Sequence, residues 1–181
     1  MIVETLGSQV TYSSLTQRMG EISKPTFIDY CDLLERQDIL FNLQAYDQNK
    51  RIGFPKKARK FHFWDPFILE TIQRWLTRER FLTGLSLEPQ KVESAIAAHF
   101  KKEGDTYYLK GTGEVDVVAL KDGKPVYIEV KWTKQLRSSD LTELKKQRPA
   151  VILTKEAEGH IDDIPALPVA RFLLNAGPPL I

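Results

Sequence analysis

Hydrophobic and polar residues alternate on both sides of Asp122-Gly123, in the stretch GEVDVVALKDGKPVYIEVKW at residues 113–132. Asp-Gly between two such runs is a strong β-hairpin signal. A turn centred on this dipeptide places Asp116 opposite Glu129. Side chains alternate between the two faces of a strand, so one face of the hairpin is wholly apolar. The other face carries Glu114, Asp116, Val118, Tyr127, Glu129 and Lys131.

The two acids on this second face would repel each other across the hairpin. Like charges directly opposite one another destabilise a ladder, so a divalent cation held between Asp116 and Glu129 would offset the repulsion. Glu129 and Lys131 lie about 6–7 Å apart along one face, which lets the Glu hold a metal while the Lys reaches a phosphate or an attacking water. The ordinary alternative is a half-buried strand whose charged face meets water. Val118 and Tyr127, which pair in the same register, count against that alternative.

The rest of the C-terminal part reads as helix, strand, hairpin, helix and strand. A helix at 88–101 would bury Val92, Ile96 and Phe100, and Glu93 flanks that stripe. Three further strands are expected: one at 106–109, one at 149–154 that is buried on both faces, and one more apolar strand within 164–174. A helix is expected to start at Ser138 to Asp140 and to end with Lys145, Lys146 and Arg148. This helix would face Leu141 and Leu144 inward. A hairpin followed by a helical crossover to a buried strand makes a mixed sheet flanked by helices.

The first third of the chain reads as two short helices and a basic hairpin. Thr11 caps a helix through Met19, and Ser23 opens a second helix. The hairpin strands are expected at 39–43 and 60–63. A further helix from Asp65-Pro66 to about Leu76 is expected to bury Phe67, Ile68, Ile72 and Trp75, and 77–87 is the expected connector. Helix, turn, helix and hairpin is the order of a winged-helix module.

The tip of the basic hairpin is the expected nucleic-acid contact of this module. Its cations are Lys50, Arg51, Lys56, Lys57, Arg59 and Lys60, of which we expect Arg51, Lys56, Lys57 and Arg59 to contact phosphates. The second helix carries Asp29, Asp32, Glu35 and Asp38 against Lys24 and Arg36, so a phosphate groove would repel it. Winged helices also serve as protein-interaction modules, and a basic loop is commonly just a solvated loop, so both alternatives stay open.

Two domains are therefore expected in an α/β (α+β) protein: a winged-helix module at 1–76 and a mixed-sheet domain at 85–181. The 181 residues have room for them. The net charge of +2 is too small to argue for nucleic-acid binding, which must rest on local clusters. The single cysteine, Cys31, excludes an internal disulfide and fits a reducing cytoplasm. No apolar run approaches the ~18 residues of a membrane span, so no membrane partner is expected.

The order of Asp116 and then Glu129-Val130-Lys131 on the hairpin resembles the PD-(D/E)xK nuclease core. The resemblance implies a restriction-endonuclease-like fold for 85–181, with Asp116, Glu129 and Lys131 as catalytic residues and Glu93 as the acid from the preceding helix. It implies Mg²⁺ or Mn²⁺ bound by Asp116 and Glu129. The Pro of the motif is missing, because Val115 precedes Asp116. Residues expected to flank a nucleic-acid backbone are Lys134, Arg137 and Lys145.

Nearly the whole chain resembles the C-terminal half of archaeal-type AAA+ ATPases, in which a winged helix precedes a nuclease-like domain. The stretches that carry the resemblance are LGSQVTYSSLTQRMG, SKPTFIDYCDLLERQDIL, KFHFWDPFILETIQRWL, GEVDVV and YIEVKW. No G-x-x-x-x-G-K-[ST] motif occurs, so the chain is expected not to bind ATP by itself. It begins directly in the winged helix, which favours a fragment with an ATPase module as partner in cis or in trans.

Two classes of function follow from these residues. One is a metal-dependent DNA endonuclease, and the other is a catalytically inactive nuclease-like scaffold that binds DNA or protein for the ATPase. Both keep Asp116, Glu129 and Lys131. An RNA-directed nuclease stays open as a third possibility.

Overall fold

The computed structural model describes residues 2–77, 88–133 and 137–174. The chain forms two compact units, Met1–His99 and Phe100–Ile181, hereafter the N-terminal unit and the C-terminal unit. Their boundary falls inside helix α4 (Glu88–Glu103). Except for Thr77, the expected connector at 77–87 lies outside the described residues.

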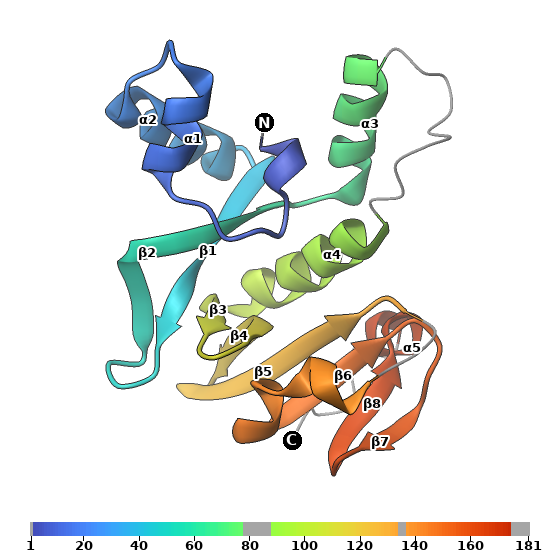
Figure 1. Ribbon diagram of the computed structural model, residues 1–181. Coiled ribbons are helices and arrows are strands. Elements are labelled where there is room, and N and C mark those ends of the chain that lie inside the picture. Colours follow the sequence, from blue (N-terminus) through green and yellow to red (C-terminus); the bar gives the residue numbers. More distant parts are fainter. Residues whose placement is uncertain (1, 78–87, 134–136, 175–181) are drawn as a thin grey trace. The chain divides into compact units, whose positions relative to one another are not determined.

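The helices and strands of the N-terminal unit follow the expected order (Figure 1). They are η1 (Val3–Thr5), α1 (Tyr12–Met19), α2 (Lys24–Arg36), β1 (Leu40–Asp47), β2 (Ile52–Phe63), α3 (Pro66–Thr77) and most of α4. Thr11 and Ser14 form a capping box, in which Ser14 N donates to Thr11 Oγ1 at 3.0 Å and Thr11 N donates to Ser14 Oγ at 3.1 Å. Ser23 caps α2, with Pro25 in its first turn. The predicted starts of α1 and α2 are confirmed.

Helix α3 turns a different face to the core than the sequence predicts. Leu69 is fully buried, and Ile68 and Ile72 pack against the same core as expected. Phe67 and Trp75, by contrast, are 71% and 79% exposed, so the prediction that they are buried was wrong. An α-helix advances about 100° per residue, which turns Phe67 about 160° away from Leu69. The other buried residues of the cluster that contains Leu69 are Leu6, Val10, Leu15, Phe27, Cys31, Leu40, Phe61 and Phe63.

The basic hairpin of β1 and β2 is longer and less regular than predicted. Its strands extend well beyond the expected ranges, so most of the basic residues lie within β2 and not in an open loop. The register shifts after Gln44, which pairs with Arg59, to Ala45, which pairs with Phe54. Residues 55–58 therefore form a bulge in β2. The isolated bridge from Val10 to Arg59 adds a short third segment beside β2.

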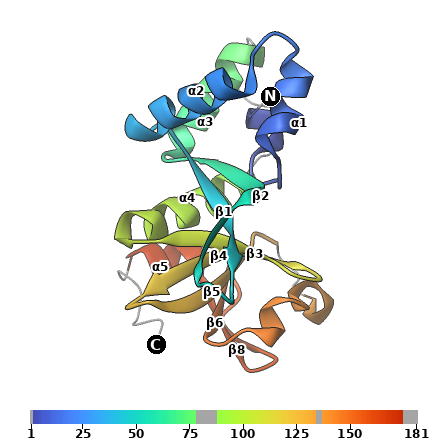
Figure 2. The ribbon, with the colours of Figure 1, turned by 90° about the vertical axis from the view of Figure 1, so that its left-hand side faces the viewer.

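The C-terminal unit is built on a mixed sheet, as predicted. Its strands are β3 (Thr106–Lys110), β4 (Glu114–Lys121), β5 (Lys124–Lys131), β6 (Ala150–Thr154), β7 (Gly159–Ile161) and β8 (Ile164–Pro168), in the order β3-β4-β5-β6-β8-β7. β5, β6 and β8 run parallel and the other pairs are antiparallel, which the two views of the ribbon let the reader follow (Figures 1 and 2). Every residue of β6 is buried, which confirms the strand expected to be covered on both faces.

Two segments of this unit differ from the prediction. The helix expected after the hairpin is instead a pair of 3₁₀ turns, η2 (Ser138–Leu141) and η3 (Leu144–Lys146). Pro149 disfavours α conformation in the residue before it, and short 3₁₀ turns commonly connect elements. Leu141 and Leu144 are nevertheless buried as expected. The expected strand within 164–174 is β8 followed by helix α5 (Val169–Leu174), where Phe172 stacks on Phe100 at 5.6 Å between ring centroids.

A buried carboxylate fixes the turn between β3 and β4. Glu143 Oε2 accepts hydrogen bonds from Thr112 Oγ1 at 2.9 Å, Gly113 N at 3.1 Å and Lys146 Nζ at 3.0 Å. Burial raises the pKa of Glu143, but these hydrogen bonds and the Lys146 charge outweigh it and hold the pKa at about 2. The carboxylate leaves no room for a side chain at Gly111, where a Cβ atom would lie 2.4 Å from Glu143 Oε1.

We predict that Gly111→Ala destabilises the protein, because the added methyl group displaces the Glu143 carboxylate from its donors. The expected loss is about 2 kcal/mol or more in the free energy of unfolding. Gly104→Ala is the matched control, since a Cβ atom there meets only Leu120 O at 3.8 Å. Urea unfolding of the full chain compares the two variants. Equal stability of both variants would contradict this account of the turn.

We also predict that the stabilisation by Glu143 disappears in acid. The folded-state pKa of about 2 lies below the ordinary value, so the contribution is complete above about pH 4.5 and is lost as the pH falls through 2. The difference in unfolding free energy between the wild-type chain and Glu143→Gln should shrink by on the order of 3 kcal/mol over that window. Urea unfolding at several pH values measures it. A difference that stays constant with pH would mean that Glu143 stabilises the turn without its charge.

Candidate functional site

The hairpin of β4 and β5 has the register that the sequence predicts. Val118 pairs with Tyr127, and Leu120 with Pro125. Asp122 and Gly123 have φ angles of 51° and 74°, the left-handed conformation that a tight two-residue hairpin turn requires. The predicted register is therefore confirmed for residues 117–121 and 124–128, and the predicted pairing of Asp116 with Glu129 lies one step beyond these pairs.

Asp116 reaches toward β5 through its side chain. Backbone pairing of the two strands extends from the turn to Val117 and Ile128. One residue farther from the turn, Asp116 Oδ2 accepts a hydrogen bond from Val130 N at 2.9 Å. The half-buried carboxylate of Asp116 is thereby fixed against the segment that carries Glu129 and Lys131.

Glu129 and Lys131 form an ion pair on β5. Glu129 is 4% exposed, and its Oε1 lies 2.6 Å from Lys131 Nζ. Burial lowers the pKa of Lys131, but the carboxylates of Glu129, Asp116 and Asp140 together outweigh burial, so the net pKa is raised above its ordinary value. Lys131 is therefore a permanent cation near neutral pH, suited to bind an anion and unsuited to act as a base.

Asp140 is a residue that sequence reasoning missed. It lies in η2, where the sequence assigned it only to a helix start, yet its charge acts on Lys131. Its side chain is exposed, and Asp140 Oδ1 accepts a hydrogen bond from Ser139 Oγ at 3.3 Å. No signal in the sequence gives this placement, because it depends on how the 3₁₀ turns return the chain to the sheet.

Asp116 and Glu129 are oxygen ligands of the kind that Mg²⁺ and Mn²⁺ prefer. Mg²⁺ is commonly held by one or two carboxylates and keeps several waters, and a carboxylate has about four acceptor positions. Within 2–77, 88–133 and 137–174, no group of three or more His, Cys, Asp or Glu residues is arranged to hold a metal ion. By their chemistry, Asp116 and Glu129 could contribute at most two carboxylates to such an ion.

Glu93 is bound to a lysine in the N-terminal unit. Its Oε1 lies 2.8 Å from Nζ of Lys60, whose side chain is only 1% exposed. A Cβ atom at Gly7 would lie 3.2 Å from Glu93 Oε2, so the backbone also approaches this carboxylate closely. The acid that the resemblance assigns to the nuclease site therefore serves a buried ion pair between β2 and α4.

The described residues that were expected to contact nucleic acid fall into three groups: exposed residues, one ion-paired residue and one buried residue. Arg51, Lys56, Lys57 and Arg137 are exposed, and Lys134 lies outside the described residues. Lys145 is half-buried and forms an ion pair with Asp162 at 2.6 Å.

Arg59 forms the third group, because it is buried inside the N-terminal unit. Its guanidinium lies 3.9 Å from the centroid of the Tyr12 ring. It also donates to Tyr12 Oη at 2.9 Å and to Pro55 O at 3.0 Å. The last bond anchors the bulge of β2, so Arg59 positions the neighbouring lysines.

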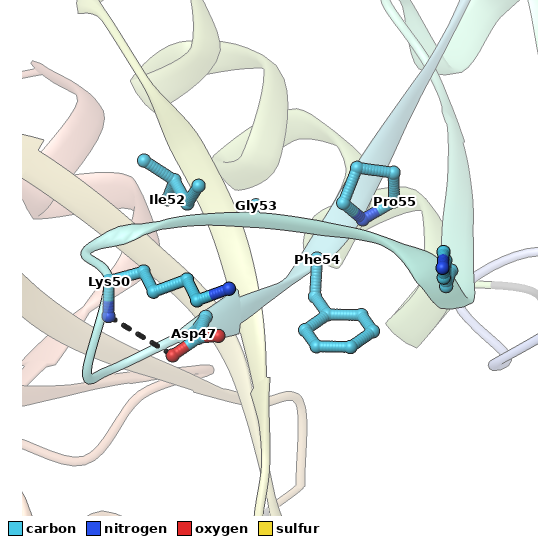
Figure 3. A pocket seen from close by; sticks show the side chains of 7 residues that line it. Asp47, Lys50, Ile52, Gly53, Phe54 and Pro55 are labelled. Atoms are coloured by element: carbon cyan, nitrogen blue, oxygen red, sulfur yellow. Dashed lines mark hydrogen bonds between the residues drawn. The ribbon is translucent and has the colours of Figure 1, made fainter.

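A pocket of about 280 Å³ lies at the tip of the β1–β2 hairpin. Ile52, Gly53, Phe54 and Pro55 give it an apolar lining, and the side chains of Asp47, Lys50 and Lys56 complete it (Figure 3). Asp47 Oδ1 accepts hydrogen bonds from Asn49 N at 3.0 Å and Lys50 N at 3.1 Å, which closes the turn. This pocket and the Asp116–Glu129–Lys131 cluster are the two candidate sites.

Comparisons with known proteins describe the chain in two parts. Residues 1–79 match a family model described as a domain of unknown function, DUF8612. Residues 90–172 match a second model, the domain of unknown function DUF4143. Neither the curated proteins nor the solved structures include a match. Of the helices that the structure describes, none has both the length and the apolar character needed to cross a membrane.

We predict that Lys131→Met destabilises the chain more than the double variant Lys131→Met/Glu129→Gln. Removing the lysine alone leaves a buried carboxylate without its cation, which typically costs about 3–5 kcal/mol, whereas replacing both charges is far less costly. Urea unfolding of the single and double variants measures the coupling. If the two substitutions prove additive, the charges of Glu129 and Lys131 do not form a pair in solution.

Proposed function

We propose that the protein is a metal-dependent nuclease of the PD-(D/E)xK type that acts on DNA, with a winged-helix module at its N-terminus. The observation that carries the proposal is the meeting of two acids and a lysine at neighbouring strands. The bond from Val130 N to Asp116 and the ion pair of Glu129 with Lys131 bring these three side chains to one end of β4 and β5. Together they match the acid, acid-x-Lys pattern by position and by chemistry.

In this proposal Asp116 and Glu129 hold the metal and Lys131 holds the substrate. Bound Mg²⁺ or Mn²⁺ would activate a water and stabilise charge on the phosphate. The ammonium of Lys131 binds a non-bridging phosphate oxygen and neutralises the charge that develops there. Binding of an anion would draw Lys131 away from Glu129, freeing Glu129 Oε1 for the metal. Glu93 has no role in this proposal, because its carboxylate is engaged by Lys60.

Several features of the N-terminal unit support the winged-helix part of the proposal. A short bridged segment at Val10, helices α1 and α2 and the β1–β2 hairpin occur in the order of that module. Helix α2 carries Asp29, Asp32 and Glu35, which would be repelled by phosphates, whereas Arg51, Lys56 and Lys57 lie exposed on the hairpin. DNA is therefore proposed to contact the hairpin.

A second function is favoured by one observation. The Glu129–Lys131 pair is short, with a buried carboxylate and a half-buried ammonium group, which suits a fixed structural ion pair as well as a site that must rearrange around a metal. On this alternative the C-terminal unit is an inactive nuclease-like scaffold that binds DNA or protein for an ATPase module, in cis or in trans. Both functions use the same strands, and only the first needs a metal.

We predict that the full chain nicks supercoiled plasmid DNA in the presence of Mg²⁺ or Mn²⁺. Lys131→Ala should reduce the rate by about 100-fold or more, because it removes the cation that meets the phosphate. Lys124→Ala, at the opposite end of β5, is the matched control and should cleave at the wild-type rate. Gel electrophoresis of time courses measures the rates, with EDTA as a further control.

The two functions give different results in this assay. Absence of cleavage with either metal on plasmid, single-stranded DNA and RNA, together with no Mn²⁺ binding by calorimetry, would overturn the nuclease and leave the scaffold. Cleavage of RNA alone would change the substrate. Cleavage that survives in Lys131→Ala would remove Lys131 from the proposed site.

A further inference from the structure

We infer that the tip of the β1–β2 hairpin binds an unpaired nucleobase together with its flanking phosphates. The inference rests on the nucleic-acid-binding part of the proposed function and names the form of nucleic acid that the hairpin takes. It does not depend on cleavage or on a metal. The observation behind it is the apolar pocket framed by cations at the hairpin tip (Figure 3).

The pocket is suited in size and lining to one planar ring system. Its volume of about 280 Å³ lies just below the usual range of about 300–1,000 Å³ for drug-sized ligands. Phe54 supplies an aromatic ring, and Ile52, which is 53% exposed, supplies aliphatic surface. Stacking on an aromatic side chain is the general way in which proteins bind unpaired bases without reading their sequence.

Cations surround this apolar lining. Lys50 and Lys56 belong to the wall of the pocket, and Lys57 Nζ lies 5.2 Å from the centroid of the Phe54 ring. The carboxylate of Asp47 accepts backbone amide hydrogens of the turn, so it is turned toward the protein's own backbone. A base in the pocket would thus have ammonium groups near it that can contact its flanking phosphates.

The pocket is pre-formed by bonds that do not involve a ligand. Asp47 closes the turn through its side chain and through its carbonyl oxygen, which accepts from Arg51 N at 2.7 Å. Arg59, held by Tyr12, fixes the beginning of the bulge through Pro55 O at 3.0 Å. Pre-organisation of this kind lowers the entropic cost of binding. The bulge in β2 therefore helps to shape the pocket.

The arrangement of polar and apolar residues favours a nucleic acid over a membrane. A segment that binds a bilayer surface presents a continuous apolar face to it. Here the extremity of the hairpin is Gln48, Asn49, Lys50 and Arg51, and the apolar residues lie behind it on β2. The polar and basic tip would therefore contact the phosphates of a nucleic acid, and a base of that nucleic acid would enter the apolar pocket behind the tip.

The test compares binding of oligonucleotides that differ only in their bases. Fluorescence anisotropy in EDTA measures the Kd of the full chain for a labelled thymidine oligonucleotide and for an abasic strand of equal length. Phe54→Ala should weaken binding of the thymidine strand by about tenfold and leave binding of the abasic strand unchanged. Lys56→Ala should weaken both equally and reduce the salt dependence of each by about one counterion. Lys102→Ala, exposed on α4, is the control cation.

Phe54→Leu separates loss of the ring from damage to the fold. It keeps apolar bulk in the pocket and should weaken binding of the thymidine strand selectively, as Phe54→Ala does. The inference is overturned if the Phe54 variants weaken both strands equally or neither, or if an acidic peptide or anionic vesicles compete for the tip better than the oligonucleotide. Base-dependent binding without plasmid nicking would overturn only the catalytic proposal, whereas nicking without base dependence would overturn only this inference.

Discussion

The ion pair of the buried Glu129 carboxylate with the half-buried Lys131 is the constraint on which the candidate site of the C-terminal unit depends. Placing two charges in a region of low exposure costs several kcal/mol per ion unless they are held close together. β5 is an inner strand between β4 and β6, and residues 127–131 are paired with 150–154. Because one step of slippage would turn Glu129 and Lys131 to the opposite face and break both registers, the sheet fixes the position of the cation.

The N-terminal unit also holds charged side chains in its interior, and they come from consecutive residues of β2. Arg59 and Lys60 follow each other, so their side chains leave opposite faces of the strand. Arg59 meets Tyr12 and the bulge, and Lys60 meets Glu93. The next residue but one, His62, is fully buried and bonds to Ser94 Oγ at 3.1 Å. Burial, aided by Lys60, lowers the pKa of His62 to about 3, so it stays neutral. Arg59 and Lys60 therefore make contacts inside the N-terminal unit, and the residues of β2 nearer the tip face solvent.

The features that the sequence predicts are those with local causes. The capped starts at Thr11 and Ser23 and the Asp122-Gly123 turn each depend on a few neighbouring residues, and the structure agrees with all three. The register of the β4–β5 hairpin then follows by counting from the turn. The positions of Asp116, Glu129 and Lys131 in the candidate site can be predicted in the same way, because all three residues belong to that hairpin.

What the sequence does not predict depends on contacts between distant segments. Trp75 is apolar and at helical spacing, yet whether it meets the core depends on which face of α3 the rest of the unit covers. Arg59 resembles the other cations of the hairpin, and its burial follows from Tyr12, which is 47 residues away along the chain. The charge of Asp140 acts on Lys131 from η2, one of the two 3₁₀ turns that stand where a helix was predicted.

The distribution of charge limits what electrostatics alone can do in this protein. The net charge is only +2, and at physiological salt the field of exposed lysines falls off within about 8 Å. A few lysines at the hairpin tip release few counterions, so phosphate contacts by themselves give weak and salt-sensitive binding. For the nucleic acid that we propose as ligand, useful affinity would have to come from short-range contacts. In the proposed binding, the aromatic ring of Phe54 beside those lysines would supply such a contact at the place where the positive charge concentrates the ligand.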